Sequence, residues 1–503
     1  MTALLRSLHC PSRIGALGRA ALVVLATGCA VGPKFVKPTP VAPDTWTSWR
    51  STDSTLYETV TAQPLRVDWW RAFHDPVLDS LIQRAFTASP DLRTAALHFA
   101  QARVQRGIVA AQRGPQAGLG AGVTGQRQSE YGAGTRMIDA IGGNRSKLVE
   151  LLSEPFTLYQ AGFDASWELD LWGRTRRSIE AGDADVDQQK ALLEMAWLSL
   201  VSDVGRNYVD LRVTQRQIQL VREEAAVLEE HLEITEAQVQ SGVRDQLALE
   251  QQQIDRTLWA QLSLLLSQEG AISNQIAALL GERPGALRDL LAARDVDIQM
   301  PLPDLAFGLP SEVALRRPDI RAAEARLRRA TAGIGIARAA LYPSIRLGAR
   351  FGYESYLRGE FADWGSHTWS VGPSLDLPLF DRGRRRAVVQ LRELEQQEAA
   401  VQYQQTVLRA WRDIDDAVNA YTAERQRAEG LWGSVRNASD AHDLMQARYT
   451  AGIVDYTAVL ESRRLFLRTR RYAMAAEGRL HTSYIAINKA LGNVPMGPDV
   501  MMK

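Results

Sequence analysis

Several stretches of the chain alternate between apolar and polar residues with a period of two. In residues 344–353 the apolar positions are Ile345, Leu347, Ala349, Phe351 and Tyr353. The same alternation occurs in residues 163–171 and 369–377 and, in a weaker glycine-rich form, in 115–126. This period predicts β-strands with one apolar and one polar face. Lengths of about 9–11 residues suit tilted membrane strands. The strand pairs would enclose long polar loops over residues 127–160 and 354–367.

A second pattern, with apolar residues spaced by three and four, predicts very long helices. It comprises Val201, Val204, Tyr208 and Leu211, and later Val407, Trp411, Ile414, Val418 and Tyr421. This spacing is a heptad-like seam. No proline lies between Pro155 and Pro284. A helix over residues 175–240 would be about 95 Å long. Shorter helices are expected over 89–113, with Ser89 as N-cap, and over 318–341.

Five ordered matches indicate that the chain is an internal duplication. The matching pairs are SPDLRTA with RPDIRAA, the glycines and prolines that follow them, ELDLWGRTRR with DLPLFDRGRR, QSGVRDQLAL with TAGIVDYTAV, and GERP with GNVP. The repeats therefore cover residues 75–284 and 310–495. Residues 285–309 link them, and 496–503 form a tail.

The N-terminus is typical of an export signal. Three arginines and a short apolar run precede Ala26-Thr27-Gly28-Cys29, which is similar to a bacterial lipobox. This predicts a signal peptide over 1–28, a lipid on Cys29 and an extended segment over 29–74. Ala30 is not the aspartate associated with retention in the inner membrane. The alternative is an ordinary signal peptide with an incidental cysteine.

Composition excludes several classes of function. The net charge of +1 gives no reason to expect nucleic acid as a partner, and two cysteines with seven scattered histidines supply little metal or redox chemistry. The GAGVTG motif at residues 120–125 lies inside an expected strand, where a dinucleotide fingerprint does not occur. Three aspartates at 183, 185 and 187 are expected to form a solvated helix face. We therefore expect no enzyme activity, no cofactor and no metal site.

The predicted elements together imply a shared barrel. Four membrane strands are too few to close one, since single-chain outer-membrane barrels need about eight. Open strand edges are not tolerated in lipid. The strands are therefore expected to be shared among copies, and three copies would supply twelve. The long helices exceed the ~30 Å of a bilayer and are expected to stand in the periplasm.

The chain resembles the TolC-like outer-membrane factors. WWRAFHDPVLDSLI (69–82) looks like the opening of these proteins, and CAVGPKFVKPTPVAP (29–43) resembles their lipoprotein branch of the nodulation-protein-T type. The resemblance implies a mixed α and β homotrimer with a twelve-stranded outer-membrane β-barrel continued by a long periplasmic α-helical barrel. It also implies docking to a periplasmic adaptor and an inner-membrane pump, in passive efflux of drugs or other small toxic compounds. The alternatives are a protein (type I) secretion duct, a metal-efflux duct, and a structural coiled-coil lipoprotein, against which the period-two strands argue.

Aromatic and basic residues follow the outgoing strands, and Trp172, Arg174, Arg384 and Arg385 are candidate membrane-interface anchors. Arginines at a helix N-terminus oppose the helix dipole. Contact with the lipid headgroups of the outer membrane would favour them there. The alternative is ordinary salt bridges between helices.

The two glycine turns resemble the periplasmic tips of the family, where the adaptor docks. The tip positions are Gly242 and Val243 in the first repeat and Gly452 and Ile453 in the second. The resemblance places the gate on Tyr449, Thr457, Glu461 and Arg464. Their counterparts Val239, Leu247, Gln251 and Ile254 carry no charge. A threefold ring of Glu461 would attract cations, whereas Arg464 and Tyr449 would tie the helix pair to its neighbours. The alternative is a surface pair between Glu461 and Arg464.

Overall fold

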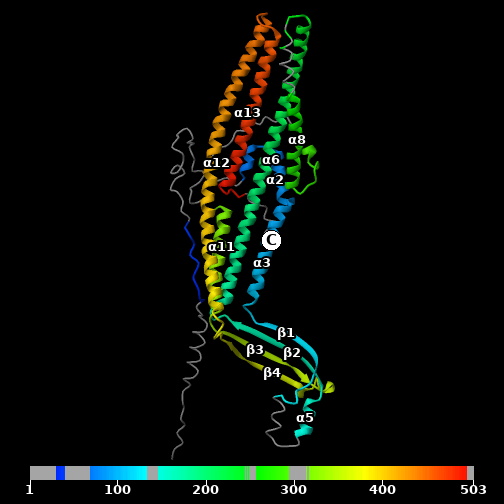
Figure 1. Cartoon of the computed structure of the whole chain (residues 1–503), viewed down its shortest axis with the longest axis vertical. Helices are drawn as coiled ribbons and strands as arrows, with labels where there is room; N and C mark the ends of the chain where they lie inside the picture. The colour runs from blue at the N-terminus through cyan, green and yellow to red at the C-terminus, as the bar shows by residue number, and fades with distance from the viewer. Residues whose placement is uncertain are drawn as a thin grey trace, which may run out of the picture. The chain divides into compact units, whose positions relative to one another are not determined.

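A computed structural model describes residues 30–39, 68–132, 145–243, 245, 247, 257–293, 313 and 316–494 (Figure 1). The expected signal peptide, Cys29, Gln251, Ile254, the C-terminal tail and most of the linker lie outside these residues. The chain divides into two compact units, each built from both repeats. The first contains described residues 30–36, 103–132, 145–185 and 327–398, and the second contains the others.

The elements of the two repeats follow one another in the same order. The first repeat runs α3 (Pro90–Ala111), β1 (Gln116–Gln126), β2 (Phe156–Leu169), α6 (Arg174–Gln240) and α8 (Thr257–Leu279), and the second runs α11 (Pro318–Ala339), β3 (Ser344–Ser355), β4 (His367–Asp376), α12 (Arg384–Thr450) and α13 (Tyr456–Ala490). The helices α6 and α12 have 67 residues each. The chain between strand and long helix is longer in the second repeat, so ELDLWGRTRR and DLPLFDRGRR do not superpose residue for residue.

The first unit holds a four-stranded antiparallel sheet in the order β1-β2-β3-β4 (Figure 1). The register places chemically similar residues side by side. One row across the sheet is Leu119, Phe163, Phe351 and Trp369, and the next row is Gly118, Asp164, Arg350 and Ser370. Since neighbouring residues point to opposite faces, one face is apolar and the other polar. The alternation in the sequence therefore predicted the faces correctly, including that of the weak glycine-rich strand, where GAGVTG lies.

Two glycines on the polar face allow β2 and β3 to approach closely. A Cβ on Gly162 would lie 2.8 Å from the carbonyl oxygen of Phe351, and one on Gly352 would lie 2.5 Å from that of Ala161. Both obstacles are backbone atoms, so any larger residue would force the strands apart. Gly348 on the same strand meets nothing closer than 3.9 Å.

The segment expected to be a polar loop over 127–160 is partly structured, which corrects the sequence prediction. It contains α5 (Arg145–Ser153), and β2 begins at Phe156 rather than near 163. Leu148, Leu151 and Leu152 of α5 are exposed in the single chain. Because the segment is polar on average, its sequence did not predict this short helix with its leucines.

The second unit is built around the predicted seam. Val201, Val204 and Leu211 of α6 have no exposed surface, and Trp411 and Ile414 of α12 are 5% and 1% exposed. These residues belong to one cluster with the short helix η2 (Trp69–Phe73), with α2 (Pro76–Ala88) and with the end of α13. Full burial of such a side chain stabilises by about 1.5–3 kcal/mol. The seam therefore supplies much of the stability of this unit.

The start of α3 differs from the expectation. The Ser89 carbonyl accepts the N–H of Arg93, but the Ser89 hydroxyl is buried and has no hydrogen-bond partner in the structure. Ser89 is therefore no side-chain cap. A side-chain cap is found instead at Asp75, which accepts the N–H groups of Val77 and Leu78 at the start of α2.

A buried polar network ties α2 to α6. The Tyr208 hydroxyl donates to the Asp75 carboxylate, and the Arg212 guanidinium donates to the Tyr208 oxygen at 3.1 Å. Arg212 also donates to the carbonyl of Ala292 at 2.9 Å. Burial, followed by the hydrogen bond with Asp75, raises the pKa of Tyr208 well above its ordinary value. The network therefore holds a neutral tyrosine between a carboxylate and a cation.

Candidate functional site

The two predicted tips have the same backbone geometry. Gly242 and Gly452 have φ of +75° and +72°, the left-handed region that favours glycine. At each tip the glycine N–H bonds the carbonyl three residues back, and the following N–H bonds the carbonyl five residues back (Val243 to Gln238, 2.8 Å; Ile453 to Arg448, 2.9 Å). This is the Schellman arrangement that ends a helix. The side chains that follow, Val243 and Ile453, are 72% and 70% exposed. Each helix end thus presents one apolar residue to solvent.

The four predicted gate residues lie in different surroundings. Thr457 is 4% exposed and faces the interior of the unit, whereas Glu461 is exposed and Arg464 half-buried. Tyr449 packs its ring against that of Tyr456, with centroids 5.1 Å apart. In this conformation of one chain, Glu461 is the exposed acid of the set.

A hydrogen bond joins α13 to α6 near the second-repeat tip, and the sequence did not predict it. The Tyr456 hydroxyl donates to Glu230 Oε1 at 2.9 Å. This hydrogen bond, more than partial burial, raises the pKa of the Tyr456 hydroxyl. The partners are 226 residues apart in the chain, and no local pattern marks either. A second link, between His442 Nδ1 and the Ser462 hydroxyl at 3.0 Å, joins α12 to α13.

The strand-to-helix corner of the first repeat is held by several polar contacts. The Trp172 ring stacks on Tyr342 with centroids 4.6 Å apart, and its Nε1–H donates to the Pro343 carbonyl at 2.7 Å. Arg174 pairs with Glu168 at 2.8 Å. The Asp170 carboxylate accepts the N–H groups of Thr175 and Arg176 in the first turn of α6. Its negative charge also interacts favourably with the positive N-terminal end of the helix dipole.

In the strand-to-helix corner of the second repeat, one carboxylate both accepts a backbone N–H at the helix start and pairs with an arginine. Asp381 accepts the N–H of Arg385 at 3.1 Å and pairs with its guanidinium at 3.6 Å. Arg384 is exposed. Carboxylates within each corner therefore pair with Arg174 and Arg385, whereas the alternative raised from the sequence was salt bridges between helices. Arg384 keeps its side chain at the surface.

Two of the three aspartates near residue 185 form ion pairs on the helix surface. Asp183 pairs with Arg106 and Asp185 with Arg329, both at 2.8 Å. No group of three potential metal ligands lies together in the described part of the chain. Among those same residues no helix is long and apolar enough to cross a membrane.

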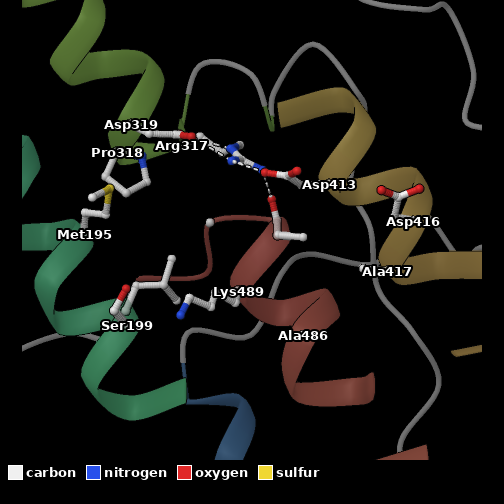
Figure 2. A pocket seen from close by; sticks show the side chains of 13 residues that line it. Met195, Ser199, Arg317, Pro318, Asp319, Asp413, Asp416, Ala417, Ala486 and Lys489 are labelled. Atoms are coloured by element: carbon white, nitrogen blue, oxygen red, sulfur yellow. Dashed lines mark hydrogen bonds and ion pairs between the residues drawn. The ribbon is translucent and has the colours of Figure 1, made fainter. Parts of the chain in front are cut away.

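A cavity of about 600 Å³ lies in the second unit, between α6, the start of α11, α12 and the end of α13 (Figure 2). Its most buried charge, Arg317, is held by Asp319 at 2.7 Å and donates to the carbonyl of Ala490. Lys489 pairs with Asp203 at 3.5 Å. Arg317 and Lys489 thus each join two helices, and the cavity lies at the junction of these helices.

Comparison with known proteins identifies the family that has this architecture. A family model described as outer membrane efflux protein matches residues 81–282 and 309–493. The chain belongs to the outer membrane efflux protein family. It is accordingly an outer-membrane channel protein of an efflux system, which confirms the family, the function and the location expected from the sequence.

Individual relatives agree with this assignment. The chain is 33% identical over 429 residues to the pyoverdine export outer membrane protein OpmQ of Pseudomonas putida, covering 84% of this chain and 87% of the relative. It is 30% identical over 457 residues to OprJ of Pseudomonas aeruginosa, covering 89% and 90%. The solved outer-membrane channel OprN is similar with a TM-score of 0.79 at 28% identity, covering 92% of this chain and 99% of that one.

Proposed function

We propose that three copies of this chain form a passive exit duct for drugs or other small toxic compounds, with a shared twelve-stranded barrel in the outer membrane. The observation that carries this proposal is the sheet. Its apolar face is exposed in the single chain, with Leu119 69% and Trp369 68% exposed. Its end strands β1 and β4 each pair on one side only within the described residues. Lipid does not tolerate such edges, and further copies would cover both.

The helices support the same assembly. Long apolar side chains are exposed at intervals along them, namely Val104, Ile108, Leu264, Leu391, Leu394 and Leu408. Removal of exposed apolar side chains from water favours association. Packing of neighbouring copies would bury these side chains and build the α-helical barrel of the duct.

The proposed partners are a periplasmic adaptor and an inner-membrane pump. The exposed Val243 and Ile453 would meet the adaptor, and the chain itself would supply no catalytic chemistry. The names of the relatives include export of pyoverdine and of toluene for those proteins, which supports small molecules as the cargo class. We further propose a lipid on Cys29 and contact of Trp172, Arg174, Arg384 and Arg385 with lipid headgroups.

The gate is proposed to lie on the second-repeat helix pair. A threefold ring of Glu461 would favour cations, Arg464 would help to hold the pair, and Thr457 would support it from within. The hydrogen bond between Tyr456 and Glu230 would be a tie between α13 and α6 that opening must break, and Tyr449 packs on the Tyr456 ring. Docking of the adaptor would break this tie and let the helices move outward.

Conductance in planar bilayers tests the proposed duct. Detergent-extracted full-length protein should insert as discrete conducting units, and Glu461→Gln should reduce cation selectivity. Protein that inserts without conducting under any applied voltage, before and after addition of an adaptor, would overturn the channel assignment.

A further inference from the structure

Residues 30–32, which directly follow Cys29, are seated in a tight site in the first unit. The Val31 N–H donates to the Trp172 carbonyl at 3.1 Å. The Arg177 guanidinium donates from Nε to the Val31 carbonyl at 3.4 Å and from Nη2 to the Gly32 carbonyl at 3.3 Å. One N–H group and two carbonyl groups of the segment are therefore hydrogen-bonded to the corner between β2 and α6.

Three glycines leave no spare room at this site. A Cβ on Gly173 would lie 2.6 Å from the Ala30 Cβ, and one on Gly32 would lie 2.6 Å from the Gly335 Cα. A Cβ on Gly335 would lie 2.8 Å from the Arg177 Cγ. Gly32 and Gly173 also have φ of +99° and +78°. Packing this close, with a side chain 6% exposed that donates to two carbonyls, is a built site rather than a passing contact.

We propose that Gly173, Arg177 and Gly335 form a retaining site for the chain's own residues 30–32, and that this site fixes where the acylated N-terminus lies. Cys29 precedes Val31 by two residues, within about 7 Å of chain. The lipid would therefore enter the membrane beside the Trp172–Tyr342 stack. The site would thus fix the depth of the lipid anchor in the membrane relative to the barrel. This inference rests on the proposed lipidation and adds to it a protein surface that positions the lipid.

The test is tryptic cleavage after Lys34 in detergent-extracted full-length protein. Lys34 is exposed and lies two residues beyond Gly32, and cleavage requires local release of the segment. Gly335→Val should raise the cleavage rate about tenfold or more, because it displaces Arg177 and Gly32. Gly333→Val on the same helix is the matched control, since the nearest atom to its Cβ is 3.8 Å away, and its rate should equal that of the parent.

Two further variants decide the remaining outcomes. Arg177→Met keeps the side-chain stem and removes both bonds to the segment, so it should also raise the rate, and it serves if Gly335→Val does not fold. Cys29→Ser, exported with an ordinary signal peptide, should keep the protection, because the site and not the lipid holds the segment. Parental rates in Gly335→Val and Arg177→Met, or loss of protection in Cys29→Ser, would overturn the proposal. Failure of lipidation itself would appear separately, in the mass of the mature N-terminus, and failure of the duct in the conductance.

Discussion

Tyr456→Phe is the sharpest probe of the proposed gate. The change removes one hydroxyl that donates to Glu230 at 2.9 Å and keeps the ring that packs on Tyr449. A hydrogen bond to a charged group contributes about 1.5–3 kcal/mol, and partial exposure of this pair places it at or below the lower end, near 1 kcal/mol. That free energy corresponds to about a fivefold shift per chain. If three copies open together, ~3 kcal/mol gives a shift on the order of 150-fold.

The assay is the open fraction in single-channel recordings without adaptor. Tyr456→Phe and Glu230→Gln should both raise it, and the double variant should add little to either, because the two side chains share one bond. Tyr472→Phe, on an exposed position of the same helix, is the matched control and should leave it unchanged. Tyr449→Phe keeps the ring contact and should have a small effect. An unchanged open fraction in Tyr456→Phe, or additive effects of the two changes, would refute the tie as a gate element.

The close approach of β2 and β3 and the buried Tyr208 network can each be tested by substitution. Gly352→Ala should impair trimer assembly in the membrane, seen as loss of the heat-resistant band on electrophoresis, whereas Gly348→Ala on the same strand should assemble normally. Tyr208→Phe should lower the free energy of unfolding by about 1–3 kcal/mol, because the buried Asp75 loses a donor; a midpoint unchanged in denaturant would contradict this. Because the folded-state pKa of Tyr208 is raised, its contribution to stability should be present below about pH 10 and decline above it, and the phenylalanine variant should lack that alkaline decline.

The sequence predicted the long helices and the strand faces well because each rests on a repeated local pattern. The expected start at 175 and end at 240 match α6 to within one residue, since no proline interrupts the seam and a glycine ends it. Period two identified even β1, despite its glycines. The strand pattern alone implied that further copies must close the barrel. The family resemblance added the expectation of a homotrimer.

The parts that the sequence did not predict depend on contacts between distant residues. The tie of Tyr456 to Glu230 and the seating of Gly32 against Gly335 join segments hundreds of residues apart, and neither pair has a local signature. The position of Ser89 before a helix fits the local rule for N-caps, yet its hydroxyl is buried without a hydrogen-bond partner in the structure. Helix α5 was missed because a nine-residue segment between polar stretches carries too little periodicity to stand out.

The most direct test of the central proposal is the mass of the particle extracted from membranes in mild detergent, by native mass spectrometry. The described residues form a four-stranded sheet, and neighbouring copies would cover its two end strands, which pair on one side only there. We expect a single species of three chains that survives removal of Cys29 acylation. A stable, conducting species of one chain would contradict the shared barrel, because the sheet would then close without further copies.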